Sequence, residues 1–358
     1  MSSESKPMPM RGVIYALTAS LLFGITTPFA KSLLEQISPV LLAGLFYLGS
    51  GLGLGIYLLT GKLTQRQSQE ASLQKKDLPA LMAAVLCGGI IAPVCLMLGL
   101  ATTQASSASL FLNLESVLTA VIAWFIFKEN FDRRLLIGML VIVAGGVLLS
   151  VNFSGQITVS YGVLLIALAC LGWGFDNNFT RMVSDANPAQ IACLKGLVAG
   201  VTNVSLAMLL GAKMPPLHFA GAAMFVGFLG YGVSLTLFVL ALRHIGTART
   251  GAYFSLAPFA GALIALVMLR EPLTIQFATA GILMGIGLWL HLTEDHAHEH
   301  EHLPMEHDHE HEHDEHHQHV HADGSVLPPG VKHSHLHEHE HLVHSHAHFP
   351  DTHHRHSH

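Results

Sequence analysis

Residues 161–183 read YGVLLIALACLGWGFDNNFTRMV, and residues 11–33 read RGVIYALTASLLFGITTPFAKSL. Each stretch is apolar over the roughly 20 residues that an α-helix needs to cross the hydrocarbon core of a bilayer. Eight more such runs follow one another with little between them, so the sequence predicts an all-α integral membrane protein with ten spanning helices. The expected spans are 11–33, 39–60, 78–101, 105–127, 134–151, 161–183, 190–211, 220–242, 247–269 and 274–292.

The composition favours a membrane protein over a soluble one. Hydrophobic residues make up 51% of the 358 residues and charged residues only 12%, whereas soluble domains carry about 25% charged residues. Residues 1–290 hold 16 basic and 10 acidic residues, whereas residues 291–358 hold 2 basic and 14 acidic residues. The composition of the whole chain is therefore an average of two different parts. The basic residues are scattered between apolar runs, which argues against a nucleic-acid partner. The four cysteines show no CxxC spacing, so no disulfide framework is expected.

The basic residues indicate the orientation in the membrane. With a cytoplasmic N-terminus, twelve Lys and Arg residues fall in the inside segments and three in the outside segments, and cytoplasmic segments carry such an excess. Because the number of spans is even, we expect both termini on the cytoplasmic side of the inner (cytoplasmic) membrane. Residues 1–10 are a short polar N-terminus, and the first apolar run is expected to stay in the membrane.

The two quoted stretches also resemble one another. A shift of 150 residues aligns Gly12 with Gly162 and Gly24 with Gly174. Other matches are Lys31/Arg181 at this shift and Leu114/Leu256, Ala120/Ala262 and Glu129/Glu271 at a shift of 142. Because five spans are an odd number, a duplicated unit would enter the membrane from the opposite side, as in the inverted repeats of secondary transporters. We therefore expect two inverted five-helix repeats, 11–155 and 156–292; shared apolar composition is the alternative explanation.

The predicted chain has ten spans in two halves, and one span in each half ends at an acidic residue, in Lys128-Glu129-Asn130 and Arg270-Glu271-Pro272. This pattern resembles the EamA-type branch of the drug/metabolite transporter superfamily. The resemblance covers about residues 11–292. It implies a carrier of the inner membrane that works by alternating access, often as an exporter of amino acids, nucleotide-related metabolites, cations or drugs. No nucleophile constellation or cofactor motif is recognisable, so neither an enzyme nor a required cofactor is expected.

Three ionisable residues stand out because they lie well inside the predicted spans: Glu115, Asp176 and Lys195. Each costs about 2.5–3.5 kcal/mol at the bilayer centre, so each requires a reason. One hypothesis is that Glu115 and Asp176 accept protons or cations in a solute site that couples export to the proton gradient. The neighbouring side chains expected in that site are Asn113, Asn177, Asn178 and, as an aromatic wall or a packing residue, Trp173. The alternative is that Lys195 neutralises one carboxylate and only orients helices.

Residues 293–358 form a histidine-rich segment. Of the 27 histidines, 25 lie between His291 and His358, many at every second position with acidic residues between them. Such a segment lacks the apolar content to fold, so a disordered cytoplasmic tail is expected. Imidazole is the commonest transition-metal ligand, so the tail should bind Ni, Co, Zn or Cu with little selectivity. The predicted ligands are His296, His298, His300, His302, His307, His309, His311, His313, His333, His335, His337, His339 and His341.

The sequence therefore predicts a proton-coupled exporter of small metabolites or of divalent transition-metal ions such as Ni, Co and Zn. Its partners would be the lipid bilayer and that solute, and a homo-oligomer is compatible with this interpretation. A membrane-anchored metal reservoir or sensor without transport is the alternative function. The two differ in one respect, because a carrier without residues 293–358 should retain flux whereas a reservoir should lose its activity.

Overall fold

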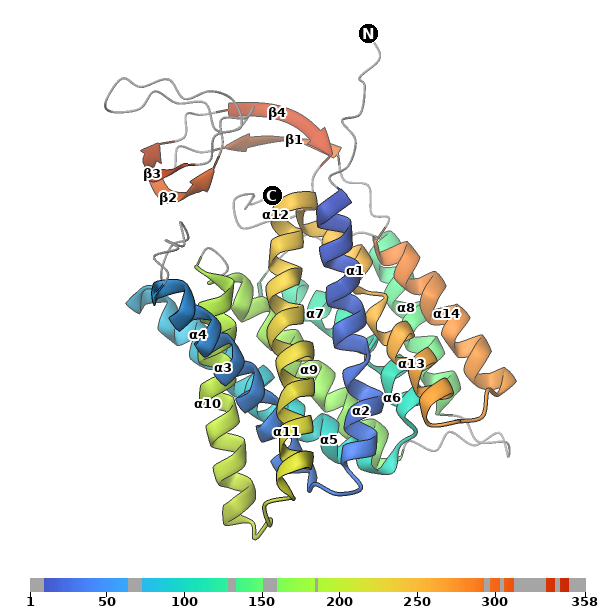
Figure 1. Ribbon diagram of the computed structural model, residues 1–358. Coiled ribbons are helices and arrows are strands. Elements are labelled where there is room, and N and C mark those ends of the chain that lie inside the picture. The colour runs from blue at the N-terminus through green and yellow to red at the C-terminus, as the bar shows by residue number, and fades with distance from the viewer. Residues whose placement is uncertain are drawn as a thin grey trace.

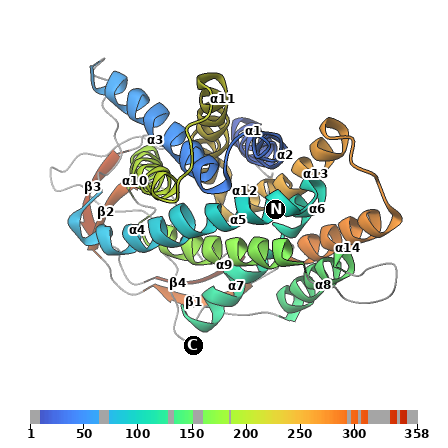
Figure 2. The ribbon, with the colours of Figure 1, turned by 90° about the horizontal axis from the view of Figure 1, so that it is seen from below.

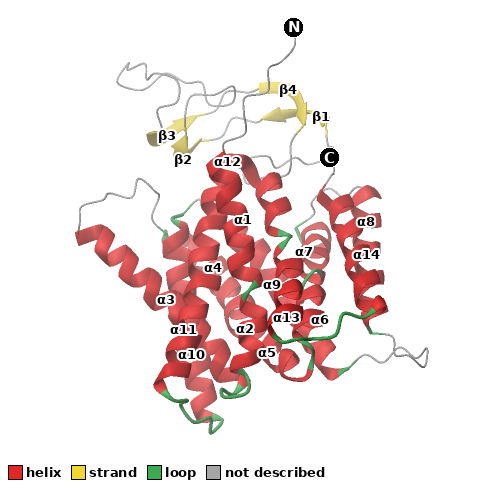
Figure 3. Cartoon of the chain, turned by 45° about the vertical axis from the view of Figure 1, so that its right-hand side comes forward, coloured by secondary structure: helices red, strands yellow, loops and turns green. Residues whose placement is uncertain are grey.

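The computed structural model describes residues 10–63, 73–127, 133–150, 160–183, 186–292, 297–302, 306–311, 333–338 and 342–347. Long helices form a bundle, and short strands lie beyond one end of it (Figures 1 and 3). The helices are α1 Met10–Gly24, α2 Thr26–Leu33, α3 Pro39–Leu63, α4 Leu78–Ala84, α5 Ala92–Thr102, α6 Ala105–Phe111, α7 Leu114–Phe125, α8 Arg133–Leu149, α9 Tyr161–Arg181, α10 Pro188–Leu209, α11 Leu217–Gly227, α12 Ser234–Phe254, α13 Ala257–Met268 and α14 Ile275–Leu292. A 3₁₀ turn, η1 (Lys75–Asp77), precedes α4, and two π-helices, η2 (Val85–Ile91) and η3 (Phe228–Val233), continue α4 into α5 and α11 into α12.

In the described part of the chain, seven helical segments are long and apolar enough to cross a membrane. They are Met10–Leu33, Pro39–Gly61, Lys75–Thr102, Ala105–Phe125, Tyr161–Arg181, Pro188–Leu209 and Leu217–Ala241, and Ala257–Met268 and Ile275–Leu290 are shorter apolar helices. These seven correspond to the predicted spans one to four and six to eight. Helix α8 lies at the predicted fifth span, α13 within the ninth and α14 at the tenth.

The predicted boundary between the eighth and ninth spans, at 243–246, is wrong. Helix α12 runs without a break from Ser234 to Phe254, and the interruption comes at Ser255-Leu256. A single glycine in a helix, such as Gly246, costs only about 1 kcal/mol, which is too little to end it. Pro258 is the second residue of α13, and because proline has no N–H it cannot donate to the carbonyl of Phe254, four residues earlier, where α12 ends.

Prolines lie beside several of the interruptions. Pro28, Pro93 and Pro258 each lie in the first turn of the helix that follows an interruption or a π-helix. A proline there leaves no helical hydrogen bond unmade, because the first N–H groups of a helix have no partner within it. The prolines therefore begin new helical segments inside the predicted spans.

Helices of the two halves of the chain pack against each other in a repeated pattern (Figure 2). Helix α3 lies along α10 at one edge of the bundle, and α8 lies along α14 at another. Helix α9 packs against α5 and α7, and α1 packs correspondingly against α12 and α13. The π-helices η2 and η3 also begin 143 residues apart.

Glycines permit the same close approach in both halves. A Cβ at Gly24 on α1 would overlap the backbone of α13 at Ala257 and Gly261, and one at Gly174 on α9 would crowd the backbone of α7 at Thr119. Gly24 and Gly174 are aligned by the shift of 150 residues, and Thr119 and Gly261 by the shift of 142. Small residues allow such backbone contact between helices in a membrane, where there is little hydrophobic drive to pack them.

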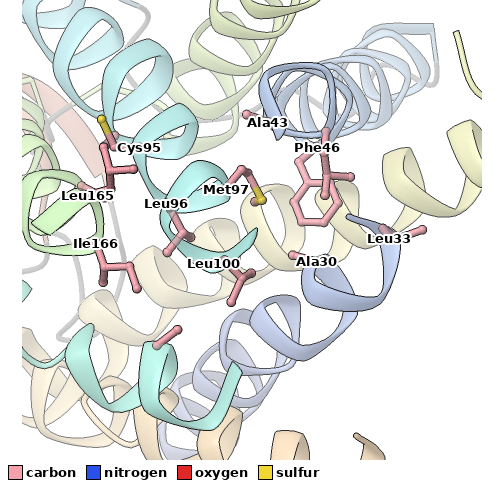
Figure 4. Close-up of a cluster of buried hydrophobic side chains, with 14 of the residues drawn as sticks. Ala30, Leu33, Ala43, Phe46, Cys95, Leu96, Met97, Leu100, Leu165 and Ile166 are labelled. Carbon is pink, nitrogen blue, oxygen red and sulfur yellow. The ribbon is translucent and has the colours of Figure 1, made fainter. Parts of the chain in front are cut away.

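The largest buried cluster lies where α2, α3, α5 and α9 meet. Figure 4 shows Phe46, Met97, Leu100 and Ile166 among its side chains, and all four are at most 3% exposed. Large apolar side chains also cover the outside of the bundle, and Val267, for example, is 74% exposed. An apolar exterior is what a lipid-facing surface requires, since lipid tails are as apolar as these side chains.

Short strands lie in the part of the tail that the structure describes. The structure describes strands β1 (Ala297–His302), β2 (Glu306–His311), β3 (His333–Glu338) and β4 (Leu342–Ala347), with β1 antiparallel to β4 and β2 to β3. The alternation of histidine with other residues has the period of two that a strand uses. The rest of residues 293–358 lies outside the described part of the chain.

Candidate functional site

Two of the three ionisable residues that stand out inside the predicted spans form an ion pair. Asp176 lies five residues before the end of α9, and Lys195 lies seven residues into α10. The Lys195 ammonium donates to Oδ2 of Asp176, and the Thr180 hydroxyl donates to Oδ1 at 2.9 Å. Only 10% of the lysine side chain and 7% of the aspartate side chain are exposed. This pair matches the helix-orienting alternative for Asp176 and Lys195.

Glu115 is the carboxylate that does not take part in the Asp176–Lys195 ion pair. It lies at the start of α7, just after the interruption at Leu112-Asn113, and is half-buried. Asn177 donates from Nδ2 to Oε1 of Glu115 at 2.9 Å and lies 3.3 Å from the Thr119 hydroxyl. Within the described part of the chain no cation pairs with Glu115, although Asp176 and Lys195 are near enough for their charges to act on it.

The other two predicted amides bond to the backbone. Asn113 donates to the carbonyl of Leu110 at 2.9 Å, within the interruption between α6 and α7. Asn178 donates to Gly174 O at 2.8 Å and to Thr119 O at 3.2 Å, which ties α9 to α7. Both are buried. The structure therefore brings Asn177 to Glu115, whereas Asn178 ties α9 to α7 and Asn113 bonds locally within the interruption.

Trp173 belongs to a set of donors around the π-helix η2. Its indole N–H donates to the carbonyl of Gly88 at 3.1 Å, and the Tyr47 hydroxyl donates to the same oxygen at 2.7 Å. Asn203 donates to the carbonyl of Gly89 at 3.1 Å. A π-helix disturbs the regular backbone ladder, and these donors occupy carbonyls of η2. The sequence did not predict that Tyr47 and Asn203 donate to this segment. The available signal was the pair Gly88-Gly89, which lies just before Pro93.

Aromatic rings from both halves surround this region. Tyr231, in the second π-helix η3, has its ring centroid 5.1 Å from that of Tyr47 and 6.0 Å from that of Phe23. Phe23 lies 6.5 Å from Trp173 and 5.5 Å from Phe254, which ends α12. Of these five rings, the sequence predicted only Trp173 as part of the site. The five rings lie on five separate helical segments, so no spacing along the chain connects them.

Gly88 is expected to be intolerant of a side chain. A Cβ at this position would overlap the carboxyl group of Asp176, and overpacking a tight site costs about 1–3 kcal/mol. Gly88→Ala should therefore lower the thermal unfolding midpoint of the detergent-solubilised protein. The matched control is Gly221→Ala on α11, where a Cβ meets no described atom within 4 Å and alanine favours the helix by up to about 1 kcal/mol. Equal midpoints for the two variants would contradict the contact.

Comparison with known proteins identifies the family of this chain. The sequence profile of the EamA-like transporter family matches it twice, over residues 10–151 and 160–293. The chain belongs to the EamA-like transporter family. It is 28% identical over 293 residues to an uncharacterized transporter of Methanothermobacter thermautotrophicus, covering 78% of this chain and 85% of the relative.

A second relative of this EamA-like transporter has a more specific name. It is the probable amino-acid metabolite efflux pump of Salmonella typhimurium, 23% identical over 296 residues, which covers 77% of this chain and 93% of the pump. A protein of known crystal structure superposes with a TM-score of 0.56 at 20% identity, over 78% of this chain and 95% of its own. That likeness shows the shared fold. The relatives are named as transporters or efflux pumps, and the chain is a multi-pass membrane protein of a transporter family.

The EamA-like transporter also carries a polar clasp at the end of the bundle away from the strands (Figure 1). The carboxylate of Glu271 accepts from the backbone N–H groups of Ala105 and Ser106, each at 2.8 Å, and so caps α6. The Lys31 ammonium donates to the carbonyls of Leu100 at 2.7 Å and Thr103 at 2.8 Å, at the end of α5. Negative charge at a helix N-terminus and positive charge at a C-terminus are both stabilising. The resemblance had drawn attention to Glu271, but its partner 166 residues away could not be read from the sequence.

Removing the clasp should loosen this end of the transporter. Lys31→Met leaves the carbonyls at the end of α5 without their cation, and losing a helix cap costs about 0.5–2 kcal/mol. The test measures maleimide labelling of a cysteine placed at Ser106, which is 1% exposed, after the four native cysteines are replaced by alanine. Labelling should accelerate about 2- to 30-fold. Lys213→Met, at an exposed lysine, is the control, and equal rates in both variants would refute the clasp.

The predicted metal ligands lie at the strands and outside the described residues. His298, His300 and His302 lie on β1, His307, His309 and His311 on β2, and His333, His335 and His337 on β3. His296, His313, His339 and His341 lie outside the described part of the chain. Among the described side chains there is no group of three or more His, Cys, Asp or Glu residues that could hold a metal ion.

Proposed function

We propose that this EamA-like transporter is a proton-coupled exporter of small organic solutes. The observation that carries the proposal is the position of Glu115, which is half-buried. Among the described residues its carboxylate accepts from the Asn177 amide and is paired with no cation. A carboxylate inside a membrane is costly, and such groups mark ion pathways and proton relays. The Asp176–Lys195 pair and Tyr231, one of the five aromatic rings, are near enough for their charges or dipoles to interact with Glu115.

Proton coupling follows from the chemistry of this carboxylate. In a low-dielectric interior the charged form is disfavoured, so Glu115 would take up a proton from the side where the proton concentration is higher. It would release the proton when the site opens to the other side. Solute binding near Asn177 and Glu115 would then compete with the proton, which drives export against a gradient.

Two inverted repeats, residues 11–155 and 156–292, would supply the alternating access. The repeated packing supports this, because α1 meets α12 and α13 as α9 meets α5 and α7. The equivalent backbone contacts of Gly24 and Gly174 support it as well. Rocking of one repeat against the other is the usual motion of such transporters. Opening on one side would break the Lys31 and Glu271 clasp.

The orientation is proposed from the charges. Twelve basic residues against three favour both termini in the cytoplasm and insertion in the cytoplasmic membrane. The Lys31 and Glu271 clasp would then close the outer side, and the histidine-rich tail would lie in the cytoplasm. Export would begin from the side on which the tail lies.

The groups around Glu115 suit an organic solute with a charged end. Aromatic rings stack on flat or apolar groups and attract cations over their faces, and the Asp176–Lys195 pair offers one charge of each sign. An amino acid or related amine fits this set, and the Salmonella relative is named as an amino-acid metabolite efflux pump. Transition metals are the second candidate, supported by the tail histidines, but the described interior offers oxygen ligands that discriminate poorly among such metals.

Flux measurement tests the proposal. The purified full-length protein is placed in liposomes, and uptake of a radiolabelled amino-acid mixture, and separately of Ni²⁺ and Zn²⁺, is followed with and without an imposed pH gradient. We expect gradient-dependent movement of organic solute and none of metal. A truncated protein lacking residues 293–358 should retain flux. Loss of all flux on truncation would support the reservoir, and metal flux alone would overturn the organic solute.

A further inference from the structure

One carbonyl of the π-helix η2 lacks a donor from its own helical segment. The N–H of Ala92, which in an α-helix would bond to Gly88 four residues earlier, donates instead to Cys87, five residues earlier. The next nitrogen belongs to Pro93, which has no N–H to offer Gly88 in the π spacing. Pro93 lies in the first turn of α5, but η2 runs into α5 without a break. Within this described segment the carbonyl of Gly88 therefore has no backbone donor in either spacing.

Two side chains from neighbouring helices occupy this carbonyl. Tyr47 of α3 donates from its hydroxyl at 2.7 Å, and Trp173 of α9 donates from its indole N–H at 3.1 Å. Both residues are buried, and a carbonyl oxygen has two lone pairs with which to accept both bonds. A buried carbonyl without any donor costs free energy comparable to a lost hydrogen bond. The two donors therefore stabilise η2 at the point where its own backbone cannot.

The same turn of η2 lies against the Asp176–Lys195 ion pair. A Cβ at Gly88 would overlap the carboxyl group of Asp176. A Cβ at Gly89 would lie 3.7 Å from Cγ of Lys195. Trp173 lies three residues before Asp176 on α9, so the indole and the carboxyl group reach Gly88 from one face of that helix. A shift of the Gly88 backbone would therefore move the surface against which the ion pair packs.

We propose that Tyr47 and Trp173 are positioning residues for solute binding beside Glu115. By donating to the Gly88 carbonyl they hold η2 in its π spacing, and η2 in turn fixes the place of the Asp176–Lys195 pair. The pair is near enough to Glu115 for their charges to interact. This role rests on the proposed function, since it requires that solute binds near the pair.

The second π-helix offers an internal comparison. Tyr47 contacts it as well, with a ring centroid 5.1 Å from that of Tyr231 in η3. In η3 the N–H of Ser234 donates to Leu229, five residues earlier, as Ala92 does in η2. The next residue there is Leu235, which keeps its N–H. The π-helix η3 thus has the same spacing without the missing donor.

Hydrogen exchange tests the shared carbonyl in the full-length protein in lipid nanodiscs. Exchange of the amides in η2 and in η3 is compared for Tyr47→Phe, Trp173→Phe and the double variant. Each single variant leaves one donor on Gly88, so exchange in η2 should rise only about 2-fold. The double variant leaves the carbonyl bare and should raise exchange by about 5- to 150-fold, more than the product of the single effects. The comparison cancels the loss of indole volume, which the single Trp173→Phe variant already contains.

Two control variants remove a donor that does not share this carbonyl. Tyr57→Phe makes the same change at an exposed tyrosine of α3 and should leave exchange unchanged. Tyr47→Phe/Asn203→Leu removes donors to two different carbonyls of η2, so its effect should equal the product of its single effects. A merely multiplicative effect of Tyr47→Phe/Trp173→Phe, or equal acceleration in η2 and η3, would overturn the role of the shared carbonyl.

Flux separates positioning from stability. In proteoliposomes, the maximal uptake rate of a radiolabelled amino-acid mixture and the concentration that gives half of it are measured. Loss of folded protein lowers only the maximal rate, whereas displacement of the ion pair weakens binding, so Tyr47→Phe/Trp173→Phe should raise the half-maximal concentration about 5-fold or more. A lower maximal rate at an unchanged half-maximal concentration would overturn the positioning role. Absence of uptake by the parent protein would overturn the proposed function instead, and the exchange measurement needs no solute.

Discussion

Glu115→Gln is expected to abolish proton-driven efflux while leaving the protein folded. Glutamine has nearly the shape of glutamate and keeps a carbonyl oxygen for the Asn177 amide, which lies 2.9 Å from the carboxylate. It cannot take up or release a proton, so the pH gradient has nothing to act on at this position. General acid–base groups typically account for factors of about 100 or more in rate, and we expect gradient-driven flux to fall at least that far.

The matched control makes the same chemical change elsewhere. Glu35 is an exposed carboxylate in the turn after α2, so Glu35→Gln should leave flux unchanged. Exchange of solute across the membrane without a gradient should survive in Glu115→Gln if the site still binds. Proton-driven flux equal to that of the parent protein would show that the coupling carboxylate lies elsewhere. Loss of the folded protein, seen by thermal unfolding, would mark Glu115 as structural.

Lys195→Met is expected to destabilise the protein by about 3–5 kcal/mol, because it leaves the buried carboxylate of Asp176 without its cation. Methionine keeps most of the length and apolar stem of lysine, so packing against α9 changes little. The remaining Thr180 hydrogen bond to Asp176, at 2.9 Å, cannot neutralise the charge. The expected readout is a lower unfolding midpoint in detergent and poor recovery from membranes.

A double variant separates structure from transport. Asp176→Asn/Lys195→Met removes both charges together, and such replacements of buried pairs are often neutral for stability. Its unfolding midpoint should therefore return towards that of the parent. If its flux also returns, the pair only orients α9 and α10; if flux stays low, the pair takes part in solute binding. A single Lys195→Met variant as stable as the parent would show that Asp176 does not depend on this cation.

Much of the fold could be predicted from residue pattern. Long apolar runs identify membrane helices because the bilayer requires about 20 residues of apolar helix. The internal matches such as Gly12/Gly162 and Gly24/Gly174 anticipated equivalent helix contacts, and Gly24 and Gly174 do meet α13 and α7. The interruptions were harder to predict, since a π-helix or a broken span follows from local glycine and proline together with the packing of neighbouring helices.

Part of the candidate site could be predicted from the sequence. Buried charges are conspicuous in apolar sequence, so Glu115, Asp176 and Lys195 stood out. Which of the carboxylates Lys195 neutralises depends on the rotation of α10 against α9, which no spacing reveals. Tyr47 and Asn203 donate hydrogen bonds to carbonyls of η2. Nothing in the sequence around these two residues indicates that role, because it depends on the position of the π-helix in the fold.

By itself the sequence determined that this chain is a multi-pass membrane protein with Glu115, Asp176 and Lys195 deep in its apolar runs and a histidine-rich tail. Those properties depend on composition and on periods of a few residues along the chain. The tertiary structure decided that Lys195 binds Asp176, that Glu115 accepts a hydrogen bond from Asn177 and that Glu271 caps a helix 166 residues away. The physical reason is that hydrogen bonds and ion pairs act over about 3 Å, and only folding brings distant residues that close.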